Sequence, residues 1–124
     1  MKVVQTGSAP AAIGPYSQAI ISGNLVFVSG QTPLSPENGQ LVGVNVTEQT
    51  DQVCKNIAAL LKAAGSSPDR VIKTTCFLAD MNDFAAFNEA YAKHFPGKPA
   101  RSTFAVKQLP RNALVEIETV AEIG

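Results

Sequence analysis

The N-terminal third of the chain alternates between β-prone runs and a segment that cannot form regular structure. Residues 2–6 are short and β-prone, whereas two prolines and a glycine make 9–15 an irregular loop. Residues 17–22 and 25–29 are rich in aliphatic side chains, and Gly23-Asn24 between them is typical of a tight turn. The pattern predicts a rigid loop followed by a β-hairpin.

The next segment passes from turns into a helix. Prolines, Asn38 and glycines make 33–43 turn-rich. Asn45 or Thr47 can cap a helix, and Gly65 is expected to follow its last turn. Between these limits the apolar residues recur at helical spacing, at Val53, Ile57, Leu60, Leu61 and Ala64. We therefore predict one long amphipathic helix.

A strand and a second helix come next. Residues 71–78 carry apolar groups on both alternating faces, which predicts a strand with neighbours on both sides. Asp80 or Asn82 can cap a helix that Pro96-Gly97 ends. The apolar side of that helix consists of Phe84, Phe87, Ala90 and Tyr91.

The C-terminal pattern predicts a second hairpin, formed by 102–107 and 113–123 and joined by a loop at 109–112. The whole order, strands with two interspersed helices, predicts an α+β fold in which both helices cover one face of a mixed sheet. The length favours a single domain over 1–124. Two helices on one face leave the opposite face of the sheet uncovered, and we expect self-association of the chain to cover it.

The register of the expected hairpin decides which side chains share a face. If Gln108 pairs with Ala113, then Arg101 lies on the same face as Glu116 and Glu118. A register shifted by one residue reverses this parity. Both alternatives stay open at the level of sequence.

Composition narrows the function classes. Ten Lys and Arg balance ten Asp and Glu, so no long-range field attracts nucleic acid or an anionic membrane. Neither a signal peptide nor a membrane span is predicted, and we expect a cytoplasmic protein. Cys54 and Cys76 have no CxxC spacing and are expected to be free buried thiols.

Several residues could carry chemistry, and each also has a purely structural interpretation. Arg101 follows Lys98-Pro99-Ala100, so a stiff loop could present its guanidinium to a carboxylate, or it could be solvated at a strand edge. Glu116 could act in a site or face water. Tyr16 at the end of the rigid loop and the Ser29-Gly30 strand end could line a pocket.

The remaining polar residues give weaker signals. Asn88 in the second helix could contact a ligand or face solvent. His94, the single histidine, is best interpreted as a surface residue favoured by a helix C-terminus. No spacing of His, Cys and carboxylates predicts a metal site, and no nucleotide-binding or GxSxG motif occurs.

Four separated motifs together resemble the RidA/YjgF family over essentially the whole chain. They are Ile13-Gly14-Pro15-Tyr16-Ser17-Gln18-Ala19, Val28-Ser29-Gly30-Gln31, Met81-Asn82-Asp83-Phe84 running on to Asn88, and Pro99-Ala100-Arg101-Ser102-Thr103-Phe104 followed by Leu109-Pro110 and Val115-Glu116-Ile117-Glu118. One position departs from many relatives, which carry Cys where this chain has Thr103.

The resemblance implies a chorismate-mutase-like α+β domain that forms a homotrimeric barrel with sites between subunits. It implies hydrolysis of 2-imino acids such as 2-iminobutanoate and 2-iminopropanoate to 2-keto acids and ammonia, without cofactor or metal. By the same resemblance, Arg101 binds the substrate carboxylate and Glu116 orients or activates water. The residues that shape the pocket would be Tyr16, Ser29, Gly30, Asn88 and the backbone of Thr103.

Two rival functions remain at this stage. An endoribonuclease or translation inhibitor would need a basic groove, which a neutral chain with one histidine does not suggest. A non-catalytic regulatory protein that binds a small ligand in the same cleft is compatible with the same residues.

Overall fold

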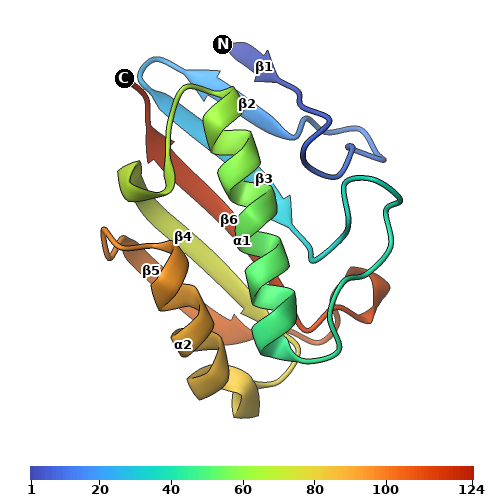
Figure 1. Ribbon diagram of the computed structural model, residues 1–124. Helices are drawn as coiled ribbons and strands as arrows, with labels where there is room; N and C mark the ends of the chain where they lie inside the picture. Colours follow the sequence, from blue (N-terminus) through green and yellow to red (C-terminus); the bar gives the residue numbers. More distant parts are fainter.

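A computed structural model describes all residues, 1–124, as six strands and two α-helices (Figure 1). The strands are β1 (Lys2–Val4), β2 (Ala19–Ser22), β3 (Leu25–Gln31), β4 (Val71–Leu78), β5 (Ala100–Ala105) and β6 (Val115–Glu122). The helices are α1 (Val46–Ala63) and α2 (Phe84–His94), with short 3-10 turns at Pro68–Arg70, Met81–Asp83 and Pro110–Asn112. None of the helices is long and apolar enough to cross a membrane.

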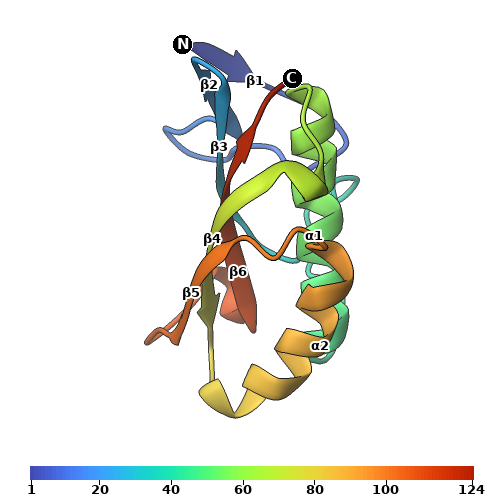
Figure 2. The same ribbon diagram turned by 90° about the vertical axis from the view of Figure 1, so that its left-hand side faces the viewer.

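The strands form one mixed sheet in the order β1-β2-β3-β6-β4-β5. Both helices pack on the same face, and the opposite face carries none (Figure 2). This arrangement confirms the predicted α+β class with two helices on one side. The bare face exposes Phe27 and Phe104 by 45% each, far more than a covered sheet would allow.

The predicted C-terminal hairpin is wrong. β5 pairs in parallel with β4, and β6 pairs in antiparallel fashion with both β3 and β4. The burial pattern agrees with this order, since alternate residues of β6 from Val115 to Ala121 are buried in the interior of the sheet, whereas β5 is mostly exposed and forms an edge. The predicted interior position of β4 is confirmed.

Local signals at the helix ends are confirmed more closely. The Asn45 side chain accepts a hydrogen bond from the Glu48 N–H at 2.9 Å and caps α1. Gly65 follows the last turn with a φ of +83°, which favours glycine at this position. Asp80 accepts from the Asn82 N–H at 2.8 Å, but it caps the 3-10 turn that precedes α2. The predicted cap of α2 itself by Asp80 or Asn82 is wrong, because α2 begins after Asp83, whose side chain makes no capping bond.

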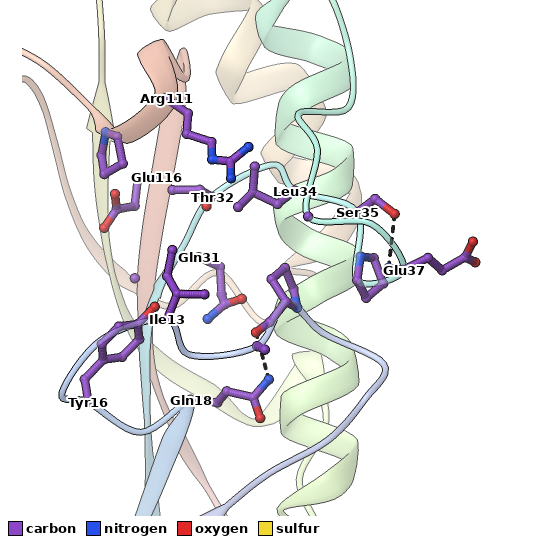
Figure 3. A pocket seen from close by; sticks show the side chains of 16 residues that line it. Ile13, Tyr16, Gln18, Gln31, Thr32, Leu34, Ser35, Glu37, Arg111 and Glu116 are labelled. Atoms are coloured by element: carbon purple, nitrogen blue, oxygen red, sulfur yellow. Dashed lines mark hydrogen bonds between the residues drawn. The ribbon is translucent and has the colours of Figure 1, made fainter.

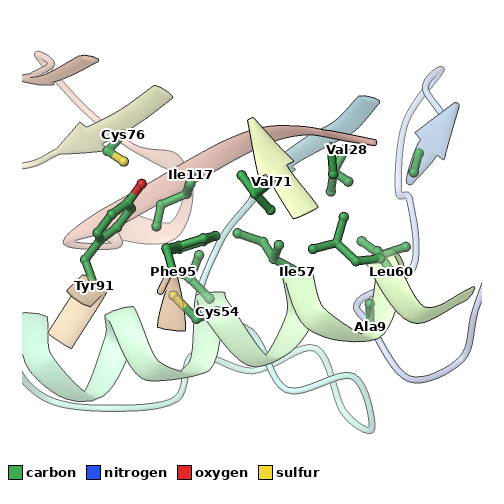
Figure 4. Packing of buried hydrophobic residues seen from close by; sticks show 14 of the residues in the cluster. Ala9, Val28, Cys54, Ile57, Leu60, Val71, Cys76, Tyr91, Phe95 and Ile117 are labelled. Atoms are coloured by element: carbon green, nitrogen blue, oxygen red, sulfur yellow. The ribbon is translucent and has the colours of Figure 1, made fainter. Parts of the chain in front are cut away.

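The core lies between the sheet and the helices (Figure 4). Fully buried side chains such as Leu60, Leu78 and Phe87 each contribute roughly 1.5–3 kcal/mol of burial free energy. Cys54 and Cys76 are both buried and free, as predicted. Burial raises the pKa of both thiols, so they remain protonated parts of the core.

Candidate functional site

The carboxylate of Glu116 lies against an irregular point in the sheet. The pairing of β3 with β6 shifts register between Val28 and Gln31, which is the signature of a β-bulge. Gly30 sits in that interval, and a Cβ added there would overlap the Glu116 carboxylate. The absent side chain of Gly30 therefore creates the space that the carboxylate occupies.

This region opens into a cavity of about 650 Å³, within the usual size range of ligand sites (Figure 3). Its floor is the strand end with Gly30, Gln31 and Glu116, and its walls come from three loops. These loops contain Ile13 and Tyr16, the segment 32–39, and Pro110-Arg111. Figure 3 shows the Glu116 carboxylate directed toward Tyr16 and the Arg111 guanidinium directed toward Leu34, so the two charges lie at different ends.

The first loop is held by two side chains from the motif regions. The amide of Gln18 donates to the Pro10 carbonyl at 2.8 Å and accepts from the Thr6 N–H at 2.9 Å. Ser29 Oγ donates to the Ser17 carbonyl at 2.6 Å. Because these bonds fix both ends of the loop, Tyr16 is oriented beside the cavity although it is 51% exposed.

The second loop is held from α1. The buried amide of Asn56 donates to the Thr32 carbonyl at 3.1 Å and to the Leu34 carbonyl at 2.9 Å. Gln49, also buried, donates to the Gly43 carbonyl at 3.2 Å and accepts from the Leu114 N–H at 2.8 Å. Asn56 thus attaches the cavity wall to α1, and Gln49 attaches two neighbouring segments to the same helix.

Two features of its environment make the Glu116 carboxylate more basic than usual. Partial burial raises the pKa of this carboxyl above its ordinary value, and the nearby Glu118 carboxylate raises it further. Glu116 forms no ion pair that would oppose this shift, since the one ion pair of the chain joins His94 to Asp51. A carboxyl with a raised pKa is a better proton acceptor from water than an ordinary surface glutamate.

Arg101 lies elsewhere, on β5, with its guanidinium against side chains of α2. Its Nη1 donates to Asn88 Oδ1 at 2.8 Å, and its guanidinium carbon lies 4.9 Å from the ring centre of Tyr91. The rings of Phe84 and Phe87 lie at 5.6 and 5.7 Å. These aromatic faces and one amide orient the guanidinium but neutralise no charge, because no carboxylate pairs with it.

Behind Arg101 the tyrosine is anchored in the core. The Tyr91 hydroxyl and Thr74 Oγ1 are 2.6 Å apart, and burial raises the pKa of Tyr91 to about 12. Thr103 on β5 pairs opposite Cys76, and its Oγ1 is buried without a hydrogen-bond partner. A hollow lined by Asn88, Tyr91, Lys98 and Arg101 lies beside this group.

Arg101 and Glu116, the two expected catalytic residues, lie on opposite faces of the sheet. Arg101 pairs with Thr74, whose side chain is buried under the helices, whereas Glu116 pairs with Phe77 on the bare face. The register hypothesis that placed Arg101 with Glu116 and Glu118 is therefore wrong, because it presupposed a β5–β6 pair that does not form. Within one chain the expected site residues do not converge.

The expected residues thus fall into two groups. Tyr16, Gly30 and Glu116 line the large cavity, and Ser29 supports its loop rather than lining it. The second group is Arg101 with Asn88 beside it and Thr103 along the same strand. No group of three or more His, Cys, Asp or Glu side chains is arranged to hold a metal ion.

Sequence reasoning gave no role to three residues that matter to this geometry. Gln18 and Asn56 hold the cavity loops, and only their burial distinguishes them from ordinary polar residues. Arg111 lines the cavity from a backbone with φ 57° and ψ 22°. Its position after Leu109-Pro110 and before Asn112 was a turn signal, but not a signal for an inward-directed side chain.

Comparison with known proteins gives the family. The sequence profile of the family described as Endoribonuclease L-PSP matches residues 6–123. The chain is 50% identical to a Mus musculus protein named 2-iminobutanoate/2-iminopropanoate deaminase, over 99% of this chain and 92% of the mouse protein. It is 53% identical to a Lactococcus lactis protein provisionally named as a regulator, AldR, over 99% of this chain and 98% of that protein.

A solved structure agrees with the fold. The crystal structure of E. coli TdcF with bound serine is similar with a TM-score of 0.94 and 39% identity, over 100% of both chains. The profile match, the relatives at about half identity and this structural agreement lead to one conclusion. The chain belongs to the RidA/YjgF family, whose motifs its sequence resembles.

Proposed function

We propose that this protein hydrolyses 2-imino acids to 2-keto acids and ammonia, in a site formed between subunits of a homotrimer. The observation that carries the proposal is the guanidinium of Arg101, which is held by Asn88 and three aromatic rings but has no carboxylate partner. A preorganised, unpaired cation of this kind is suited to clamp the carboxylate of a small substrate.

Glu116 would supply the proton transfer. Its raised pKa and its place above Gly30 in a large open cavity suit a group that holds and deprotonates a water molecule. Tyr16, at the rim of the same cavity, would limit the space above the imine carbon. The backbone of Thr103, two residues beyond Arg101, would complete the carboxylate side of the site.

A neighbouring subunit would bring a second Arg101 close to Glu116. Since Arg101 and Glu116 face opposite sides of one sheet, Arg101 of one chain can meet Glu116 only of another chain. Three features support association: the bare sheet face, the exposed apolar side chains on it, and the free edge of β5. A cyclic trimer would create three equivalent sites.

The reaction then proceeds as follows. Arg101 holds the carboxylate while Glu116 takes a proton from water, and the water oxygen bonds to C2 of the imine. The C=N electron pair moves to nitrogen, which receives a proton, and a tetrahedral carbinolamine forms. Glu116 then passes the proton of the carbinolamine hydroxyl to the amine nitrogen, the O–H electron pair forms the C=O bond as the C–N bond breaks, and ammonia and the 2-keto acid leave. Acid–base catalysis of about 10²–10⁴-fold with positioning suits a reaction that is already feasible in water.

A subunit-mixing experiment tests activity and architecture together. Arg101→Ala and Glu116→Ala chains are each expected to be nearly inactive on imines generated by a threonine dehydratase and competed with semicarbazide. After denaturation and refolding as a mixture, random trimers should regain about one quarter of wild-type activity, since each site takes Arg101 and Glu116 from different chains. The separately refolded variants are the control. No recovery in mixed trimers would refute the shared site, and full activity of Arg101→Ala would refute the clamp.

A regulatory role without turnover is the second candidate, favoured by the name of the Lactococcus lactis relative and by the serine bound in TdcF. It predicts saturable binding of a 2-keto acid with no acceleration of imine hydrolysis. Calorimetric titration with 2-oxobutanoate beside the hydrolysis assay separates the two candidates. Salt-dependent cleavage of RNA, absent in Arg101→Ala, would instead favour a nuclease.

A further inference from the structure

The large cavity extends well beyond the residues that the proposed reaction uses. Glu116, Gly30 and Tyr16 occupy one end of the 650 Å³ volume, and Leu34 and Arg111 lie toward the other. A three-carbon imino acid held by its carboxylate and its C=N group would leave this second end filled only with water. A longer substrate side chain would extend into it from C2.

Arg111 gives this end a positive charge. Residues Arg111 and Asn112 both have a left-handed backbone, with φ of 57° and 55°, a conformation that non-glycine residues rarely adopt in succession. The left-handed turn follows Pro110 and carries the Arg111 side chain over the cavity rather than away from the chain (Figure 3). Local strain that orients a charged side chain toward a cavity is typical of binding sites.

No carboxylate of the chain pairs with that charge, and the Arg111 side chain is exposed. The one ion pair in the structure joins His94 and Asp51, so Arg111 has no carboxylate partner. Glu37 also borders the cavity, but its carboxylate points away from the cavity toward solvent (Figure 3). The Glu116 carboxylate and the Arg111 guanidinium point toward different ends of the cavity and form no ion pair with each other (Figure 3).

We propose that Arg111 forms a second anion subsite and that the enzyme prefers 2-imino acids with an acidic side chain, that is, four- and five-carbon 2-imino dicarboxylates. The proposal rests on the proposed hydrolase function and adds its substrate class. Arg101 of one chain holds the C1 carboxylate, Glu116 acts at C2, and Arg111 binds the distal carboxylate. The directional guanidinium–carboxylate pair also limits the range of chain lengths that fit.

The test compares two substrates of nearly equal shape. Flavoprotein amino-acid oxidases produce the 2-imino acids of glutamate and of glutamine in situ, and these differ in a carboxylate against a neutral carboxamide. Wild-type kcat/KM is expected to favour the glutamate-derived imine by about tenfold, the discrimination that one charge-assisted contact to an exposed guanidinium supplies. Arg111→Gln should reduce this ratio to near one, and Arg111→Lys should restore part of it.

Two controls separate the proposal from its alternatives. Lys55→Gln removes one positive charge from the outer side of α1 and should leave the ratio at its wild-type value, which excludes an effect of net charge. The aspartate-derived imine, one carbon shorter, tests the reach of Arg111. Equal rates for both wild-type substrates, or an unchanged ratio in Arg111→Gln, would overturn the subsite while leaving the hydrolase function intact. No hydrolysis of either imine would overturn both.

Discussion

Replacement of Gly30 by alanine tests the arrangement around Glu116 most directly. An alanine Cβ would lie 3.0 Å from Cδ and 3.3 Å from Cγ of Glu116, and it would overlap Oε2. Carbon atoms prefer separations of about 3.5–4.0 Å, so the carboxylate must move by roughly 1 Å or adopt another rotamer. Because Gly30 has no positive φ, the effect arises from this overlap and not from backbone strain.

The structure sets the expected magnitudes. A misplacement of about 1 Å reduces catalysis by roughly 10²-fold, so kcat for imine hydrolysis should fall by about that factor. The stability loss should be small, about 0.5–1.5 kcal/mol, because a partly exposed glutamate can rotate away. The imine hydrolysis assay with semicarbazide competition gives kcat, and urea unfolding gives the free energy of unfolding.

A double-mutant cycle makes the explanation refutable. In a Glu116→Ala background no carboxylate remains to collide with, so Gly30→Ala should cause almost no further loss of activity or stability. Gly7→Ala is the matched control, since a Cβ there meets nothing within 4 Å. Full activity of Gly30→Ala in the wild-type background, or additive effects in the double variant, would show that Gly30 does not create the space for Glu116.

The remaining predictions concern the pKa of Glu116, the hydrogen bonds of Asn56 and the oligomeric state. The pKa of Glu116 is raised, so kcat/KM should rise with pH through an inflection above the ordinary carboxyl range, and Glu116→Gln should abolish that inflection. Because its pKa is raised on folding, the Glu116 carboxyl destabilises the folded chain at pH values above its unfolded-state pKa of about 4.5. Glu116→Gln should therefore increase the free energy of unfolding at pH 7 but not at pH 3. Equal effects at both pH values would contradict the raised pKa. Asn56→Ala should lower stability by about 1–3 kcal/mol, measured by denaturant unfolding, because the Thr32 and Leu34 carbonyls lose their donor. Light scattering should give three times the 13.0 kDa chain mass, and a monomer at assay concentration would refute the shared site.

The sequence by itself determined the local structure. Helical spacing of Val53, Ile57 and Leu60 located α1. Asn45, one of two candidate caps in the sequence, and Gly65 mark its ends, because caps act through bonds between near neighbours in the chain. Motif similarity named Arg101 and Glu116 as candidates, although it could not place them relative to each other.

Only the tertiary structure decided which strands pair and which faces the side chains occupy. The chain order suggested that β5 and β6 form a hairpin, but β6 inserts between β3 and β4, where its alternate residues are buried in the core. Strand pairing depends on contacts between residues far apart in sequence, and a local pattern contains no information about them. The separation of Arg101 from Glu116, and the entry of Arg111 into the cavity, follow from that pairing and from a left-handed turn.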